Sequence, residues 1–350
     1  MPAPDHKSNP NVNPHLSEQI SQRRQALLAP EVYVERILRG DRVTLGKVIT
    51  LIESARADHQ EIAQKIIAQC LAHSGRSLRI GITGAPGVGK STFIEAFGLH
   101  LLSLPRKVAV LAVDPSSQVS KGSILGDKTR MLELAAQPQA FIRPSPAGES
   151  LGGVARKTRE TILLCEAAGY DTIIIETVGV GQSETAVHSM TDFFLLLLLP
   201  GAGDELQGIK RGIVEMADLI AINKADGERK GLAMRAKREY AGALHLFPPK
   251  ASGWSPQSVL CSAIENYGIA EIWKQLLAYQ DLTMQNGYFR QNRKLQSKYW
   301  LHESINAHLR ALFSGNAKVR DLMETVEQQV LEGSMTPFRG AELLMEAFGK

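Results

Sequence analysis

The sequence predicts an α/β fold in which a mostly parallel sheet carries helices on both faces. Between residues 78 and 261, short apolar runs alternate with helical segments, which is the rhythm of βαβ units. The runs lie at 78–83, 108–113, 172–175, 193–199, 219–222 and 259–261. A glycine-rich motif follows the first run and polar clusters follow later ones, so functional loops are expected at the carboxyl ends of the strands.

Helical patterns flank this region. Between residues 30 and 72, apolar side chains share helix faces, as in the set Leu45, Val48, Ile49 and Ile52. Beyond residue 281 two further stripes occur. They are Leu301, Ile305, Leu309 and Leu312, followed by Val319, Leu322, Val326 and Val330. Gly333 ends the second stripe, and Thr336 with Pro337 predicts the start of a last helix.

These patterns divide the chain into four parts. We expect a disordered tail over 1–15, a helical extension over 16–76, a nucleotide domain over 77–280 and a helical arm over 281–350. The apolar stripes of the arm must be buried, either on the N-terminal helices or in a dimer interface.

Composition limits the class of protein. A net charge of only +4, with acids and bases interleaved, does not favour nucleic-acid binding. The most hydrophobic run, 193–199, is too short to span a bilayer, which needs about 20 residues, and reads as a central strand. Three scattered cysteines (Cys70, Cys165 and Cys261) suit reduced thiols and a cytoplasmic location.

The glycine-rich motif is a phosphate cradle. Residues 84–91 fit G-x-x-x-x-G-K-[ST], preceded by a strand-like run and followed by a helical pattern. Its glycines let backbone N–H groups face a phosphate, the lysine adds a charge, and the serine can ligate Mg²⁺. The predicted fold is therefore a P-loop NTPase, the alternative being a glycine turn that only joins strand to helix. The expected nucleotide-binding residues are Gly84, Ala85, Pro86, Gly87, Val88, Gly89, Lys90, Ser91 and Thr92.

A second motif identifies the base. Asn223, Lys224 and Asp226 fit N-K-x-D after the run 219–222. Guanine presents two N–H donors on one edge, which the Asp226 carboxylate can accept together, whereas adenine offers no such pair. The motif therefore favours GTP over ATP, the alternative being a turn or helix N-cap. Backbone N–H groups of Ser262 and Ala263, after the last run, can contact the guanine carbonyl.

Acidic residues follow two strand-like runs and can serve Mg²⁺ and catalysis. Asp114 and Glu176 each lie at a strand tip, from which a carboxylate can hold Mg²⁺ through its waters. Asp114 equally suits a turn before a proline. Gly179 permits a close backbone approach that senses the γ-phosphate. Val180 stands where many GTPases have the glutamine that orients the attacking water, so hydrolysis by the isolated protein is expected to be slow.

Two glycine-punctuated, charged segments, 121–130 and 201–210, suit regions that order on the γ-phosphate and relax after hydrolysis. In the first, Asp127 can support Mg²⁺ or the water. In the second, Gln207 and Lys210 are candidate switch residues that read the nucleotide state. Asp127 and Lys210 can equally be solvated loop charges.

The ordered set of motifs closely resembles the MeaB/ArgK family, the GTPases associated with methylmalonyl-CoA mutase. The resemblance covers about residues 41–350. The motifs that carry it are GAPGVGKS at 84–91, VDPSS at 113–117, GSILGDKTRM at 122–131, ETVGVGQSE at 176–184, LQGIK at 206–210 and NKAD at 223–226.

The resemblance implies a homodimeric G protein that chaperones an adenosylcobalamin-dependent acyl-CoA mutase. Such a protein gates cobalamin loading and protects the mutase, and adenosylcobalamin is bound only through the partner. GTP or GDP and Mg²⁺ are the expected ligands, with Lys90, Asp114, Asp127, Glu176 and Gly179 as catalytic residues. The resemblance implies metal contacts from Ser91, Asp114, Asp127 and Glu176. It also implies that the C-terminal helices form the dimer interface.

Two other functions remain open. One is an ATP-dependent kinase linked to basic-amino-acid transport, which the guanine-reading Asp226 argues against. The other is a metal-delivery GTPase, a class that carries His-rich or clustered Cys tracts after the P-loop. Between Lys90 and Glu176 the chain has only His100 and Cys165 of these types.

Overall fold

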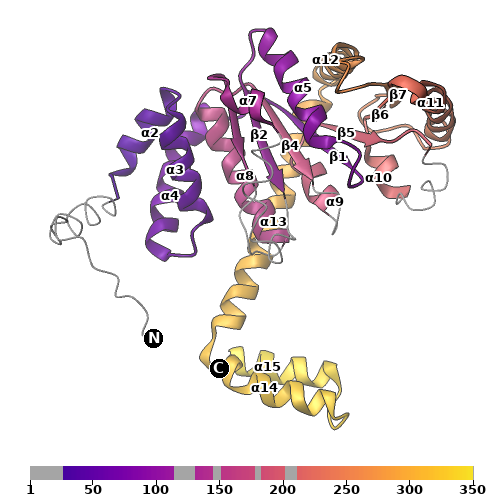
Figure 1. Ribbon diagram of the computed structural model, residues 1–350. Coiled ribbons are helices and arrows are strands. Elements are labelled where there is room, and N and C mark those ends of the chain that lie inside the picture. Colours follow the sequence, from indigo (N-terminus) through magenta and orange to yellow (C-terminus); the bar gives the residue numbers. More distant parts are fainter. Residues whose placement is uncertain (1–26, 114–130, 145–150, 178–182, 202–210, 350) are drawn as a thin grey trace, which may run out of the picture.

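The computed structural model describes residues 27–113, 131–144, 151–177, 183–201 and 211–349 (Figure 1). The tail expected over 1–15 lies outside them. The described strands form one parallel sheet in the order β3-β2-β4-β1-β5-β6-β7, which confirms the predicted α/β class. Their bounds are β1 (Leu78–Gly84), β2 (Val108–Val113), β3 (Ala140–Arg143), β4 (Thr172–Thr177), β5 (Phe193–Leu198), β6 (Leu219–Ile222) and β7 (Gln257–Leu260).

Two edge strands differ from the prediction. Strand β3 was not expected, because it is only four residues long and ends in the charged Arg143. Strand β7 begins two residues earlier than expected, at the exposed Gln257. Both strands lie at the sheet's edges, where half-exposed polar positions weaken the hydrophobic signal that marks a central strand.

Helices cover both faces of the sheet (Figure 1). Successive residues of β5 point to opposite layers: Phe193 packs with helices α5 and α12, and Phe194 with the layer of α8 and α9. The helices of this region are α5 (Lys90–Ser103), α7 (Leu132–Ala136), α8 (Leu151–Ala167), α9 (Ser183–His188), α10 (Arg211–Met216), α11 (Lys230–Leu244) and α12 (Ile269–Gln285). Short 3₁₀ turns lie at Leu71–His73 and Gly227–Arg229.

The N-terminal extension is a three-helix layer of α2 (Pro30–Leu38), α3 (Arg42–Glu53) and α4 (Ala57–Cys70) packed against α8. Asp41 caps α3 by accepting hydrogen bonds from the backbone N–H groups of Val43 and Thr44. The predicted stripe of Leu45, Val48, Ile49 and Ile52 is buried in the shared core, as its helical spacing requires.

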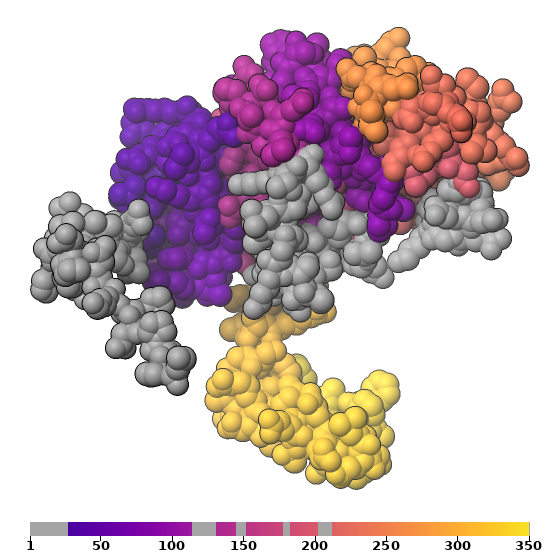
Figure 2. Space-filling model, in the orientation of Figure 1, coloured from indigo at the N-terminus to yellow at the C-terminus, as the bar shows by residue number. Residues whose placement is uncertain are grey.

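The C-terminal helices leave the sheet. Helix α13 (Tyr288–Gly315) runs from α12 to a hairpin of α14 (Ala317–Leu331) and α15 (Pro337–Gly349), which stands apart from the body in Figures 1 and 2. The Thr336 hydroxyl accepts a hydrogen bond from the N–H of Arg339, as expected for a cap before Pro337. No helix among the described ranges is both long and apolar enough to cross a membrane.

Buried charges join α13 to the sheet. Arg79 at the start of β1 pairs with Glu166 of α8 at 2.9 Å, and Asp192 before β5 pairs with Arg293 of α13 at 2.6 Å. The Asp192 carboxylate also accepts the backbone N–H of Arg79. Both carboxylates are shielded from water and each has several donors. The Asp192–Arg293 pair therefore holds α13 against the sheet, and the Arg79–Glu166 pair holds α8 against β1.

Candidate functional site: a guanine-nucleotide site

The phosphate cradle lies between the end of β1 and the start of α5. Gly84 has φ +154°, and a Cβ there would lie 2.5 Å from the carbonyl oxygen of Leu197. Gly89 has φ +92°, and a Cβ there would lie 3.0 Å from the amide nitrogen of Asn223. Only glycine fits these two positions without displacing the neighbouring strand or the base motif. The loop between them, including the exposed Pro86, is therefore free to present backbone N–H groups to phosphate.

Lys90 starts α5 and is buried, with 9% of its surface exposed. Its ammonium donates to the carbonyl oxygens of Gly84, at 2.7 Å, and Ala85, at 3.2 Å. Burial lowers the pKa of Lys90, and the carboxylates of Glu176 and Glu184 oppose that effect. Because the Lys90 ammonium donates only to neutral carbonyl oxygens among the described residues, it can exchange them for phosphate oxygens without breaking a salt bridge.

Ser91 and Glu176 provide the metal side of the site. The Ser91 hydroxyl donates to the Glu176 carboxylate at 3.4 Å, a long hydrogen bond between α5 and the end of β4. Next to it, the hydroxyls of Thr177 and Thr83 bond at 2.8 Å and tie β4 to β1. A hydroxyl beside a carboxylate suits Mg²⁺, which Ser91 would hold directly and Glu176 through water. Bound there, Mg²⁺ would neutralise charge that develops on the phosphates.

The base motif is attached to the phosphate cradle. The Asn223 amide donates to the carbonyl oxygen of Val88 at 2.9 Å, and the Lys224 ammonium donates to that of Gly87 at 2.8 Å. Lys224 has φ +57°, an uncommon left-handed conformation for a residue other than glycine. These bonds couple the loop that binds phosphate to the loop that reads the base.

Asp226 faces the loop after β7. Its carboxylate accepts a hydrogen bond of 2.6 Å from the hydroxyl of Ser262, which is fully buried. The backbone N–H of Ala263 lies 3.4 Å from the Asn223 side-chain oxygen. A carboxylate oriented in this way can accept both N–H donors of guanine. Of the two backbone N–H groups predicted to contact the guanine carbonyl, that of Ser262 donates to the carbonyl oxygen of Tyr267 at 2.9 Å, so only that of Ala263 remains a candidate.

The structure thus brings the described members of the predicted site to one edge of the sheet. Thr92 lies in the first turn of α5 with its side chain exposed. Asp114, Asp127, Gly179, Gln207 and Lys210 lie outside the described residues, so their predicted roles stay predictions.

One contact in the base loop was not predicted. The Cys261 thiol lies 3.6 Å from the Asn223 side-chain oxygen, and burial raises the pKa of Cys261 to about 12. The thiol therefore stays protonated at neutral pH and can donate to that oxygen. The sequence interpretation of Cys261 as a small core residue and not a nucleophile agrees with this environment, but nothing in the sequence signals the contact.

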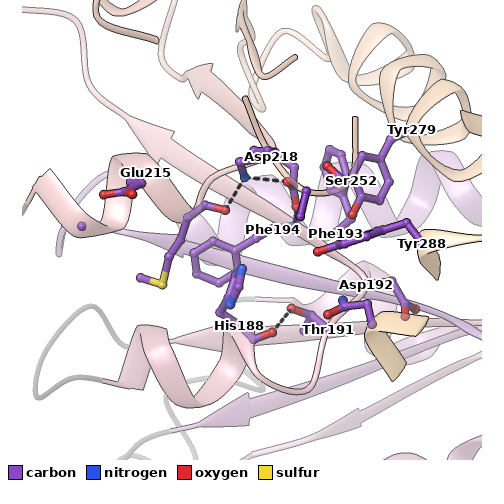
Figure 3. A pocket seen from close by; sticks show the side chains of 15 residues that line it. His188, Thr191, Asp192, Phe193, Phe194, Glu215, Asp218, Ser252, Tyr279 and Tyr288 are labelled. Atoms are coloured by element: carbon purple, nitrogen blue, oxygen red, sulfur yellow. Dashed lines mark hydrogen bonds and ion pairs between the residues drawn. The ribbon is translucent and has the colours of Figure 1, made fainter. Parts of the chain in front are cut away.

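A cavity of about 350 Å³ lies at the opposite edge of the sheet, where β5 and β6 begin (Figure 3). Of the described residues that line it, Lys250 is the one lysine or arginine. Its ammonium donates to the carbonyl oxygens of Met216 and Ala217 at 2.8 Å and to the Asp218 carboxylate at 2.7 Å. With its charge committed to three oxygens, the cavity has no lysine or arginine left for a phosphate, so it does not compete as the nucleotide site.

Comparison with known proteins agrees with this geometry. The profile of the family described as methylmalonyl-CoA mutase-associated GTPase MeaB matches residues 45–318. A protein of Caulobacter vibrioides described as "Putative GTPase" is 49% identical over 314 residues, covering 90% of this chain and 96% of that protein. The mouse protein described as "Methylmalonic aciduria type A homolog, mitochondrial" is 45% identical, covering 89% of this chain and 78% of its own.

One solved structure is similar along nearly the whole chain. The crystal structure described as an LAO/AO transport system kinase has a TM-score of 0.74 and 36% sequence identity, and covers 93% of this chain and 100% of its own. This likeness includes the P-loop domain and the helices that flank it.

Proposed function

Because the chain belongs to the MeaB family of methylmalonyl-CoA mutase-associated GTPases, we propose that its GTPase cycle serves a cobalamin-dependent acyl-CoA mutase. In this proposal the protein gates adenosylcobalamin loading and protects the mutase, and cobalamin is bound through the mutase alone. The observation that carries the proposal is the family match over 274 residues, from 45 to 318, which spans the nucleotide site and all of α13. The name of the mouse relative, which refers to methylmalonic aciduria, supports the same link.

Partner control of hydrolysis follows from the residues near the γ-phosphate. The sequence has Val180 where a water-orienting glutamine is common, so the isolated protein is proposed to turn over slowly. Segments 121–130 and 201–210 would rearrange when the mutase docks, with Gln207 and Lys210 reading the nucleotide state. Rapid GTP hydrolysis would then occur only when the mutase is bound.

We expect a cobalamin-dependent acyl-CoA mutase to raise the GTPase rate at least tenfold, which corresponds to about 1.4 kcal/mol of the barrier. Lys210→Ala should blunt this stimulation more than it changes the basal rate, because the residue is proposed to couple the two proteins and not to bind GTP. Phosphate release is measured with and without the purified mutase. A rapid basal rate that is indifferent to the mutase would refute the chaperone role and leave the GTPase activity standing.

The C-terminal arm, residues 281–350, is proposed to form a homodimer. Four apolar side chains at helical spacing on α13 are exposed by 45–60%. They are Leu301, Ile305, Leu309 and Leu312. An apolar stripe of this kind suits an isologous contact, in which the same surface of two copies is buried.

Sedimentation should therefore give about twice the chain mass of 38.2 kDa. The double variant Ile305→Asp with Leu309→Asp should sediment as a monomer, since four charges per dimer would have to be buried. Leu246→Asp is the matched control, because Leu246 is 84% exposed and lies outside the arm. A parent protein that sediments at 38.2 kDa, or a double variant that stays dimeric, would exclude this interface.

A kinase linked to basic-amino-acid transport is the second candidate, supported by the similarity to the crystal structure described as a transport system kinase. The Asp226 carboxylate, held by the Ser262 hydroxyl, argues against this candidate. It offers acceptors for two N–H donors, which guanine has on one edge and adenine does not. For metal delivery, the described part of the chain groups no three His, Cys, Asp or Glu side chains as a metal site. The three buried free cysteines are in keeping with the proposed cytoplasmic location.

A further inference from the structure

The cavity of Figure 3 lies at the edge of the sheet opposite the nucleotide site. Strands β5 and β6 begin there, α9 ends there at His188, and α10, α12 and α13 supply further walls. In Figure 3, Tyr279 and Tyr288 lie on the right of the cavity, and His188 and Glu215 lie on the left. Its volume of about 350 Å³ falls within the range of sites that hold small molecules, about 300–1,000 Å³.

Tyr279 of α12 turns a buried side chain toward this cavity. Only 3% of the residue is exposed, and its ring packs edge-on against Phe193 and Trp254, with centroids 5.1 and 5.6 Å away. Its hydroxyl forms no hydrogen bond with the described residues, and it is not one of their unpartnered atoms that are closed to solvent. The hydroxyl therefore opens on the cavity that Tyr279 lines. Buried polar groups normally have a partner, so this hydroxyl is available to a bound molecule.

A second hydroxyl and the local charges give this part of the cavity a negative field. Tyr288, the first residue of α13, is half-buried, and its hydroxyl also forms no hydrogen bond with the described residues. Burial raises the pKa of Tyr279, and the neighbours Asp218, Tyr288 and Asp192 raise it further. Burial and Asp218 likewise raise the pKa of Tyr288. Both hydroxyls stay protonated at neutral pH, and the field around them favours a positively charged group.

The described lining as a whole disfavours an anion. It carries the carboxylates of Asp192, Glu215 and Asp218 but only one ammonium, that of Lys250, which is held by three oxygens. Burial lowers the pKa of His188, with Asp218 opposing and Lys250 adding to the effect, so the imidazole is neutral at neutral pH. Aromatic rings line the same walls, and their faces attract cations.

We propose that this cavity binds a small organic cation, a primary ammonium carried on an apolar or aromatic body. The ammonium donates hydrogen bonds to the hydroxyl oxygens of Tyr279 and Tyr288, and the body packs against the aromatic side chains of the wall. The proposal rests neither on GTP binding nor on a mutase partner, because the site lies at the other edge of the sheet and shares no residue with the phosphate cradle or the base motif.

The first test compares three ligands that share one body and differ at its end. Calorimetry at neutral pH measures the affinity of the full-length protein for 2-phenylethylammonium, 2-phenylethanol and 3-phenylpropionate. The ammonium should bind at least tenfold more tightly than the alcohol, and the carboxylate more weakly than either, because the three differ chiefly in charge. An ammonium that does not bind measurably, or binds no more tightly than the alcohol, would overturn the proposal, as would a carboxylate that binds best.

The second test removes the proposed acceptors one at a time. Tyr279→Phe keeps the ring and its contacts, and it should weaken ammonium binding at least threefold, since one hydrogen bond contributes about 0.5–1.5 kcal/mol. Tyr288→Phe should give a loss of the same size. Tyr299→Phe is the matched control, because Tyr299 is 48% exposed on α13 and lies outside this cavity, so the variant should bind like the parent. Melting temperatures establish that each variant is folded. Parental affinity in both the Tyr279 and Tyr288 variants, or an equal loss in the Tyr299 variant, would contradict the proposed site.

Discussion

Replacing Lys90 by alanine is expected to remove productive binding of GTP and with it hydrolysis. The Lys90 ammonium lies over the phosphate loop, 2.7 Å from the Gly84 carbonyl oxygen. Loss of such a charged donor costs about 2.7–4 kcal/mol in the transition state, so kcat/KM should fall at least 100-fold. The rate of phosphate release at saturating Mg²⁺ measures the effect.

The fold should survive this change. Among the described residues Lys90 bonds to two carbonyl oxygens of the loop and to no carboxylate, and removing a buried charge relieves its desolvation. Circular dichroism and the melting temperature should match the parent, as should those of Lys65→Ala, an exposed lysine on α4. A Lys90→Ala protein with parental turnover and a normal spectrum would show that the phosphate site is misplaced.

Asp226→Asn should nearly abolish recognition of guanine. The carboxylate can accept two N–H donors from the base, and a hydrogen bond to a charged group is worth about 1.5–3 kcal/mol, so GTP affinity should fall by about 3–6 kcal/mol. The asparagine instead offers one donor and one acceptor, which complements xanthine. Calorimetric titration with GTP and XTP measures the change, and the variant should prefer XTP.

The control for this variant is Asp58→Asn, because Asp58 is half exposed and pairs with Arg56 far from the nucleotide site. It should bind GTP like the parent. Parental GTP affinity in Asp226→Asn would eliminate Asp226 as the residue that reads the base.

Local patterns explain how much of the fold was predictable. The central strands are continuous apolar runs because both faces of a parallel sheet are buried, and β5 was expected within one residue of its bounds. The phosphate and base motifs are equally local, since each needs a turn directly after a strand. Parallel strands then carry such turns to one edge, which is why Gly84, Glu176 and Asn223 meet although they are far apart in sequence.

Long-range pairings were not predictable, because the sequence signals are local. Arg79 and Glu166 are 87 residues apart, and nothing near either residue signals that they pair. The edge strand β3 was missed because its apolar run is only three residues long, from Ala140 to Ile142, and is followed by Arg143.

The nucleotide site proposed here lies at one edge of the sheet, where it binds and hydrolyses a guanine nucleotide. The most direct test is a calorimetric titration of the parent protein with GTP, GDP and ATP in Mg²⁺. A site built to hydrogen-bond two donors rejects a base without them by about 10⁴-fold or more, so GTP and GDP should bind at least 1,000-fold more tightly than ATP. Equal affinity for ATP and GTP would contradict guanine recognition at this edge of the sheet and favour an ATP-dependent kinase.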